Sequence, residues 1–207
     1  MTLLKLDHLA LTSETLEAGR AHVEDALGAP LTPRGEHPLM ATHNHLLSLG
    51  DEEYFEVIAV DPNGVAPNRP RWFNIDNFSG LPRLTNWIVS TQNIEAALDA
   101  LPDGFGTPIA FKRGEFEWSM AVPDDGILPW GGWGPALIQW HSEMHPAPML
   151  PDQNVRLSTV LLRHPQAVEI AAAIAPLLPR DTILFEEANT PSLSASFDTP
   201  LGPRSLS

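Results

Sequence analysis

Apolar and polar positions form short blocks along the chain, and their spacing predicts a repeated order of strands and helices. Residues 6–11, 43–49 and 54–60 have the length and apolar content of strands, and a Gly50-Asp51 turn separates the last two. Between the first two strands, apolar side chains recur at helical spacing up to Leu27, and Gly28 follows as a typical helix stop. The first part of the chain therefore predicts the order strand, helix, strand, strand.

The same order returns twice further along the chain. In the second copy, strands are predicted over 85–90, 108–112, 117–122 and 136–140, and a helix that begins near Thr91 follows the first of them. The third copy is shorter: strands are predicted over 157–163, 182–186 and 194–198, and a helix from Pro165 to about Leu178 lies between the first two. Repeated modules must pair to bury their apolar faces, so the pattern predicts an α+β protein built from paired modules.

Composition narrows the classes of partner. The chain has 207 residues, a formal net charge of −14, 12 Lys and Arg side chains and no cysteine. Phosphate binding needs clustered cationic side chains, so we expect no nucleic-acid partner. No apolar run approaches the roughly 18–20 residues of a membrane span, and the first residues lack the pattern of a signal peptide. The lack of cysteine excludes thiolate metal sites and fits a cytoplasmic location. We therefore expect a cytoplasmic protein whose partner is a small molecule.

Two longer motifs carry a family likeness. The ordered segments KLDHLAL, LGAPL and GEHPLMATHNHLLSLGDEEYFEVIAVDP resemble the glyoxalase-like proteins of the vicinal oxygen chelate superfamily, and PALIQWHSEMHPAP resembles the end of their second module. That superfamily also holds glyoxalase I, extradiol dioxygenases and bleomycin-resistance proteins. The resemblance covers residues 3–148. It implies that paired βαβββ modules curl a mixed sheet around a cleft.

The resemblance also implies a division of the chain. We expect a glyoxalase-like domain over 1–150, with module one over 3–61 and module two over 83–148. Residues 151–207 are expected to form a truncated third module, a βαββ extension packed on the same domain. Whether the modules pair within one chain or across a homodimer stays open at this point.

In metal-dependent members of the superfamily, the first and last strands of each module supply the metal ligands. The matching positions here are His8, Glu56, Trp87 and Gln139. An indole cannot bind a metal, which leaves His8, Glu56 and Gln139 as the expected ligands. This set is compatible with a divalent Zn, Fe, Mn or Ni ion and does not choose among them.

His8 and Glu56 are also the strongest candidates on their own chemistry. Strand alternation places His8 on one face with Leu6 and Ala10, where it is either a core histidine or a site residue. Glu56 lies in a largely apolar strand, and a buried carboxylate is costly unless it is paired, metal-bound or protonated. A raised pKa would suit Glu56 as a general base beside a carbonyl, and the alternative is a structural hydrogen bond.

His43 and His45 share one strand face, so they form either a chelating or acid/base pair or a pair with one member in solvent. His37, beside Pro38, is expected in a loop of the kind that rims clefts. His145 is expected to be structural.

The remaining candidates are side chains that could hold a substrate. Tryptophans in a cleft form an apolar wall, an arginine can hold a carboxylate through a bidentate fork, and an amide can orient a substrate oxygen. The expected substrate-binding residues are Trp87, Trp118, Trp130, Trp133, Gln139 and Arg113.

The sequence therefore predicts a small-molecule enzyme of the lyase, isomerase or dioxygenase type that acts on a substrate with vicinal oxygens. Glu56 is expected as the base or metal ligand, with His8 and a member of the His43/His45 pair as its catalytic partners. The alternative is a metal-free protein that sequesters a ligand, as bleomycin-resistance proteins do. The clustered histidines favour the enzyme, whereas Trp87 at a ligand position favours the binder.

Overall fold

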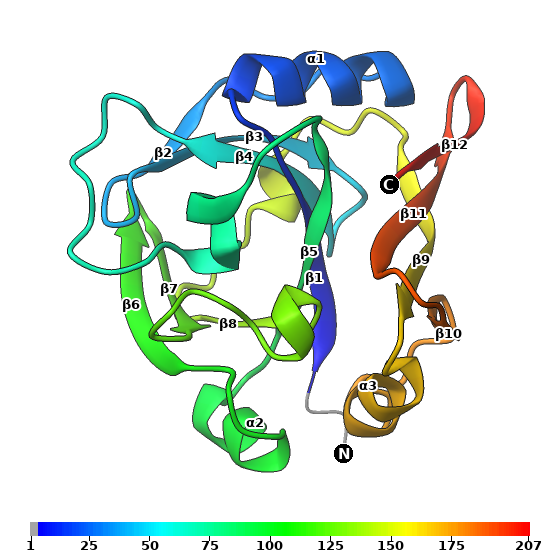
Figure 1. Cartoon of the computed structure of the whole chain (residues 1–207). Helices are drawn as coiled ribbons and strands as arrows, with labels where there is room; N and C mark the ends of the chain where they lie inside the picture. Colours follow the sequence, from blue (N-terminus) through cyan, green and yellow to red (C-terminus); the bar gives the residue numbers. More distant parts are fainter. Residues whose placement is uncertain (1–3) are drawn as a thin grey trace.

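The computed structural model describes residues 4–207 and contains two sheets with three α-helices (Figure 1). The first module consists of β1 (Lys5–Thr12), α1 (Leu16–Leu27), β2 (Gly35–His37), β3 (Thr42–Ser48) and β4 (Tyr54–Val60). The second consists of β5 (Arg83–Ser90), α2 (Ile94–Ala100), β6 (Thr107–Arg113), β7 (Phe116–Val122) and β8 (Ala136–Trp140). Each module is thus a βαβββ unit.

The two modules form one mixed sheet of eight strands within a single chain. Its order is β2-β3-β4-β1-β5-β8-β7-β6, and the first strands of the two modules, β1 and β5, pair antiparallel in the middle. In each module the first strand also pairs parallel with the last, β1 with β4 and β5 with β8. The predicted α+β class and paired βαβββ architecture are confirmed.

The third module forms a separate sheet beside the first (Figure 1). This module consists of β9 (Arg156–His164), α3 (Ala167–Ile174), β10 (Ile183–Glu187), β11 (Ser192–Thr199) and β12 (Gly202–Leu206). The order of its strands in the sheet is β10-β9-β11-β12. The ring of Phe197 on β11 packs edge-on against Phe55 on β4, with centroids 5.8 Å apart. One continuous apolar core therefore lies between the two sheets.

Local sequence explains where the helices begin and end. The Thr15 side chain accepts a hydrogen bond from the Ala18 N–H at the start of α1, and Gly28 ends that helix with a φ of 67°. Helix α2 is capped by Asn93 rather than by Thr91, and α3 is shorter than predicted. The pattern does not reveal β2 and β12, which have three and five residues and few apolar side chains.

A β-bulge in β1 changes which face its side chains occupy. Leu6 pairs with Val89 and His8 pairs with the adjacent Ile88, so Asp7 is an extra residue in the strand. Leu6 consequently joins the core between the sheets, while Asp7 and His8 both turn to the opposite face. The simple alternation that groups Leu6 with His8 is wrong for this reason.

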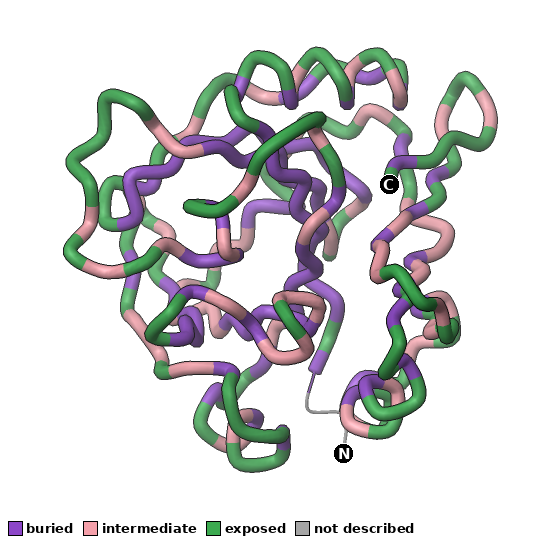
Figure 2. The backbone as a smooth tube through the Cα atoms, in the orientation of Figure 1, coloured by how far each residue is buried: buried purple, intermediate pink, exposed green. Residues whose placement is uncertain are grey.

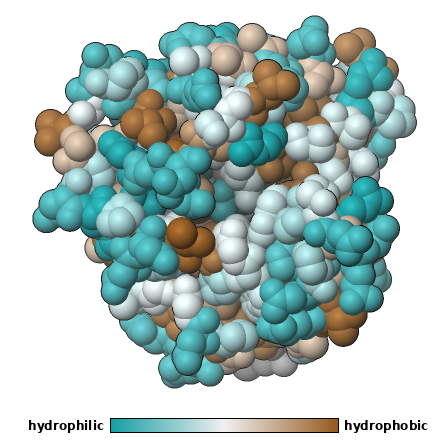
Figure 3. Space-filling view, viewed as in Figure 1, coloured by the Kyte–Doolittle hydropathy of each residue, from teal (hydrophilic) through white to brown (hydrophobic). Residues whose placement is uncertain are grey.

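Burial follows this architecture. The tube in Figure 2 is buried along most of β1, β3 and β4, and exposed along the outer turns of α1, α2 and α3. Figure 3 shows that the hydrophobic residues on the visible face form separate spots among hydrophilic ones rather than one patch. Within residues 4–207, no helix has both the length and the apolar content needed to cross a membrane.

Candidate functional site

A small cavity lies on the face of the eight-stranded sheet that is turned away from the core between the sheets. Its volume is about 30 Å³, which accommodates one or two water-sized groups. Both modules and the segment after β4 line it, through His8, His37, Asn44, Leu46, Tyr54, Glu56, Trp72, Phe73, Arg113, Trp118, Met120, Ile138 and Trp140. The cavity thus combines acid/base side chains from module one with mainly aromatic and apolar side chains from module two.

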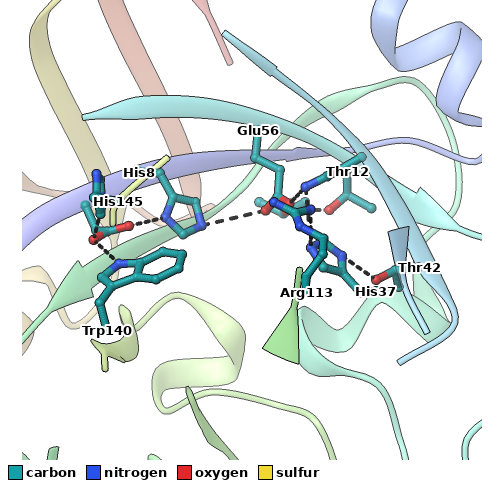
Figure 4. Close-up of polar contacts among 11 residues, drawn as sticks. His8, Thr12, His37, Thr42, Glu56, Arg113, Trp140 and His145 are labelled. Atoms are coloured by element: carbon teal, nitrogen blue, oxygen red, sulfur yellow. Dashed lines mark hydrogen bonds and ion pairs between the residues drawn. The ribbon is translucent and has the colours of Figure 1, made fainter. Parts of the chain in front are cut away.

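The centre of the cavity is a buried pair of acid and base. His8 on β1 and Glu56 on β4 are 3% and 5% exposed, and the His8 Nε2 lies 3.6 Å from the Glu56 Oε2 (Figure 4). The Tyr54 ring stacks on the His8 imidazole with centroids 4.3 Å apart. Two strands that are neighbours in the sheet but distant in sequence therefore present an imidazole and a carboxylate to one hollow.

The other nitrogen of His8 is held by Asp7. The His8 Nδ1 lies 2.7 Å from the Asp7 Oδ1. The second oxygen of Asp7 accepts a hydrogen bond from the Trp140 Nε1 at 3.0 Å and contacts the His145 Nε2 at 3.2 Å. In Figure 4, His8 accordingly lies between Glu56 on one side and the Trp140 and His145 pair on the other.

A second polar group borders Glu56. The Asn44 side-chain amide donates to the Glu56 Oε1 at 2.6 Å, and the same amide lies 3.4 Å from the His37 Nε2. The Arg113 Nη1 is 3.5 Å from that nitrogen, while the His37 Nδ1 is 3.1 Å from the Thr42 Oγ1. Because both groups near Nε2 are donors, we assign the His37 proton to Nδ1 and the lone pair to Nε2.

Opposite charge states follow for the two imidazoles. Burial alone would lower the pKa of His8, but the hydrogen bonds and charges of Asp7 and Glu56 outweigh it and raise the pKa to about 9. Burial lowers the pKa of His37 to about 4, with Arg113 and His8 acting in the same direction against the charge of Glu56. At neutral pH, His8 is an imidazolium and His37 is a neutral imidazole.

The same contacts also change the pKa of the two carboxylates. Burial would raise the pKa of Asp7 and of Glu56, yet both are lowered. For Asp7, the hydrogen bonds from His145 and His8 outweigh burial, and for Glu56 the hydrogen bond from His8 contributes most. The site therefore contains Asp7 and Glu56 as anions on either side of the His8 cation.

Six of the predicted site residues do not line this cavity. The Gln139 side chain accepts a hydrogen bond from the Ile94 N–H at the start of α2, on the opposite face of the sheet, whereas its neighbours Ile138 and Trp140 do line the cavity. The Trp87 Nε1 donates to the Trp133 carbonyl, and the Trp87 ring packs against the C-terminal sheet. The structure therefore does not bring Gln139 to His8 and Glu56.

The two histidines of β3 also face away from Glu56. His43 and His45 pair with Ala59 and Val57, whose side chains belong to the core under α1. The His45 Nδ1 is bonded to the Thr32 carbonyl. The residue of β3 that reaches the site is Asn44, which lies between them.

Of the tryptophans predicted in or next to the loop before the last strand of module two, one lines the cavity and two lie elsewhere. Trp118 on β7 lines the cavity and stacks on Phe111, with ring centroids 5.5 Å apart. Trp130 instead donates to the Glu169 carboxylate on α3, and Trp133 packs against the core between the sheets. Of the predicted substrate-binding residues, only Trp118 and Arg113 line the cavity.

Several members of the site escape sequence reasoning. Alternation places Asp7 on the wrong face, His37 is expected only in a loop, and His145 is expected to be structural. The signal available for His37 is the GEHP segment, which forms the short strand β2. No sequence signal points to Asn44 or to Trp72, which approaches through a 3-10 segment over Trp72–Asn77 with positive φ at Phe73.

The donors present do not fit the divalent metal that the resemblance implies. Within residues 4–207, no group of three or more His, Asp or Glu side chains converges in a way that could hold a metal ion. The His8 nitrogens both face carboxylates, and Gln139 lies elsewhere.

Comparison with known proteins identifies the family. A family model described as "Glyoxalase-like domain" matches residues 6–178. The chain belongs to the glyoxalase-like domain family. No curated protein matches the chain significantly.

Solved structures place this glyoxalase-like chain among related folds. A hypothetical protein from Staphylococcus aureus superposes with a TM-score of 0.60 at 17% identity, covering 92% of this chain and 88% of its own. Methylmalonyl-CoA epimerase from Mycobacterium tuberculosis gives a TM-score of 0.41 at 15% identity, covering 65% and 85%. A variant of Streptomyces coelicolor methylmalonyl-CoA epimerase in complex with 2-nitronate-propionyl-CoA gives 0.43 at 12%, covering 69% and 99%. The first likeness supports the fold, and none of the three specifies a substrate.

Proposed function

We propose that this glyoxalase-like chain is an enzyme that moves a proton at a carbon next to a carbonyl, in a small substrate with vicinal oxygens. The observation that supports this most is the buried His8 and Glu56 pair, 3.6 Å apart, which opens into a cavity shared with Arg113. An acid and a base so close together can act on adjacent atoms of one substrate.

The proposed step divides the work between the two side chains. A carbonyl oxygen of the substrate accepts the His8 Nε2–H, and Glu56 removes the proton from the neighbouring carbon. The C–H bond breaks, its electron pair shifts onto the oxygen as an enolate, and Glu56 becomes a carboxylic acid. The His8 cation stabilises the new charge in a site that excludes most water. Return of the proton to the same or the adjacent carbon completes an epimerisation or isomerisation.

Substrate binding is also expected to make Glu56 a better base. The His8 contact is the largest influence that lowers the pKa of Glu56 against the effect of burial. Once the His8 hydrogen points to the substrate oxygen, this compensation weakens and burial dominates. The pKa of Glu56 then rises toward the range that suits proton abstraction.

The position of Arg113 favours a substrate that carries a carboxylate. Its guanidinium lines the cavity from the end of β6, and none of the ion pairs among the described residues includes it. A guanidinium can bind a carboxylate through two parallel hydrogen bonds. The cavity beside His8 holds only one or two water-sized groups, so it must widen when a substrate binds. We propose a 2-oxo acid of a few carbon atoms, whose keto oxygen and carboxylate are vicinal oxygens; the keto oxygen enters beside His8 and the carboxylate stays on the Arg113 side.

The test follows proton exchange in D₂O. Pyruvate, hydroxypyruvate and 2-oxobutyrate are incubated with protein previously dialysed against EDTA, and the loss of the C3 proton signal is followed by NMR. The wild-type chain is expected to exchange at least one of the three above the buffer rate. E56Q should reduce that rate roughly 100-fold or more, the usual size of a general-base contribution. E36Q, which changes an exposed carboxylate on β2, is the matched control and should retain the rate.

Three outcomes would reject the proposal. They are no exchange of any of the compounds by the wild type, equal rates in wild type and E56Q, and a rate that requires added divalent metal after the EDTA step. A protein that exchanges none of them but tightly binds an apolar aromatic probe would instead favour the sequestering alternative, which the aromatic lining of the cavity makes chemically reasonable.

A further inference from the structure

We infer that Asp7 is a positioning residue that holds His8 as a cation with its Nε2–H directed into the cavity. This inference rests on the proposed function, because it gives His8 the role of hydrogen-bond donor to the substrate and leaves the role of base to Glu56. Nothing in the sequence pattern suggests it, since alternation places Asp7 on the opposite face of β1.

The β-bulge is what makes the contact available. Consecutive side chains of a regular strand point to opposite faces, so an Asp-His pair at adjacent positions cannot normally meet. The extra residue in β1 turns Asp7 and His8 to the same side, and their polar atoms then lie 2.7 Å apart. The backbone irregularity and the side-chain contact are therefore one feature.

Asp7 is itself held rigidly by module two. It is 1% exposed, its Oδ1 faces the His8 Nδ1, and its Oδ2 faces the Trp140 Nε1 and the His145 Nε2. Trp140 ends β8, and His145 lies just beyond it. With both carboxylate oxygens occupied, Asp7 has a single stable orientation.

The consequence for His8 concerns both its orientation and its charge. A donor contact from Nδ1 to Asp7 fixes the ring and leaves Nε2 facing Glu56 and the cavity. A buried cation also needs nearby anions, and Asp7 supplies one that does not take part in the proposed proton transfer. When Glu56 becomes neutral during the reaction, Asp7 is the carboxylate that still balances the charge on His8.

The first experiment uses the unmodified chain. Long-range ¹H–¹⁵N NMR of the histidine rings at pH 7.5, with His8 assigned by its loss in H8Q, reports which ring nitrogens carry protons. We expect both His8 nitrogens to be protonated, with a slowly exchanging Nδ1–H. A neutral His8 with its single proton on Nε2 would overturn the inference without the use of any variant at Asp7.

The second experiment changes Asp7. D7N keeps the shape but removes the charge, so the titration midpoint of His8 should fall by at least one pH unit. Affinity for oxalate, a planar mimic of the enolate, should fall at least tenfold by calorimetry. D7E, which restores the carboxylate, should recover part of both effects, whereas a merely structural role would not follow the charge. D124N is the matched control because Asp124 is exposed and lies outside the cavity and the Asp7 cluster, and it should change neither quantity.

The outcomes separate the two proposals. A His8 midpoint that stays unchanged in folded D7N overturns the role of Asp7, whatever the exchange rates are. If D7N lowers the midpoint but proton exchange is unaffected by E56Q, the proposed function fails while the control of His8 by Asp7 stands.

Discussion

At the scale of single residues, the site keeps one histidine charged and another neutral a few side chains apart. His8 faces two carboxylates, while His37 faces two donors, the Asn44 amide and the Arg113 guanidinium. Both rings are almost fully buried, so burial alone would make both neutral. The difference in charge therefore arises entirely from the partners, and these partners come from different strands.

This arrangement predicts a maximum of stability near pH 6.5. The pKa of His8 is raised to about 9 in the fold, so its contribution is complete below 6.5 and is lost as the pH rises toward 9. The pKa of His37 is lowered to about 4, so its contribution is complete above 6.5 and is lost as the pH falls toward 4. Each shift corresponds to about 3 kcal/mol of unfolding free energy, and urea unfolding at a series of pH values measures it.

Variants of the two histidines test which one causes the loss of stability at high pH and which at low pH. H8Q should flatten the alkaline side and leave the acid side steep. H37Q should leave the alkaline side steep and reduce the loss between pH 6.5 and 4; the slope that remains there belongs to His43, whose pKa burial also lowers, and the loss below pH 4 belongs to Asp7 and Glu56. H22Q changes a histidine on the exposed side of α1 and serves as the control, with the wild-type profile expected. A profile in H8Q as steep above pH 6.5 as that of the wild type would show that His8 is not the group responsible.

At the scale of elements, alternation locates most strands but not the faces they present. The predicted ranges 54–60 and 136–140 coincide with β4 and β8, because long apolar runs between turn residues leave little choice. The candidate site is harder to predict because the bulge at Asp7 and the side-chain direction of Gln139 depend on pairing with other strands. His8 and Glu56 can be found because each is a polar residue within an apolar strand, whereas His37 lies on a strand too short to show a period.

Gly35 on strand β2 lies so close to two side chains of the site that a substitution there tests their positions. A Cβ added at Gly35 would lie 2.4 Å from the Asn44 Oδ1 and 2.9 Å from the Arg113 Nη1. Gly35→Ala should therefore displace both side chains and lower oxalate affinity at least tenfold by calorimetry. The change in unfolding free energy should be about 1 kcal/mol, because the added Cβ meets the side-chain ends of Asn44 and Arg113 rather than the backbone. E36A, at the exposed neighbouring position, should keep wild-type affinity, and equal affinity in Gly35→Ala would contradict the proposed place of Arg113.

At the scale of the whole molecule, the cavity depends on both modules, and the modules depend on the C-terminal sheet. The central β1 and β5 pairing lets Asp7 contact Trp140 and places Glu56 in one cavity with Arg113, both partners coming from the other half of the chain. On the reverse face, the core continues into the third module through Phe197, and Arg180 forms an ion pair with Glu53 next to β4. This continuity suggests that residues 151–207 unfold together with the rest of the chain.

Phe197→Ala tests that cooperation. Phe197 is fully buried against Phe55, and removal of such a ring costs about 3–5 kcal/mol of unfolding free energy. All six tryptophans precede residue 141, but Trp87, Trp130 and Trp133 lie against the third module. With these three replaced by Phe in the background used, the fluorescence of the remaining tryptophans reports on the first two modules and far-UV circular dichroism on the whole chain. If the third module shares their core, the loss should appear equally in both signals, as one shifted transition. V168A removes an exposed side chain from α3 and should leave the midpoint unchanged. Should circular dichroism shift while fluorescence keeps its wild-type midpoint, the third module would be an independently folding unit, and the strands that carry His8 and Glu56 would not depend on it.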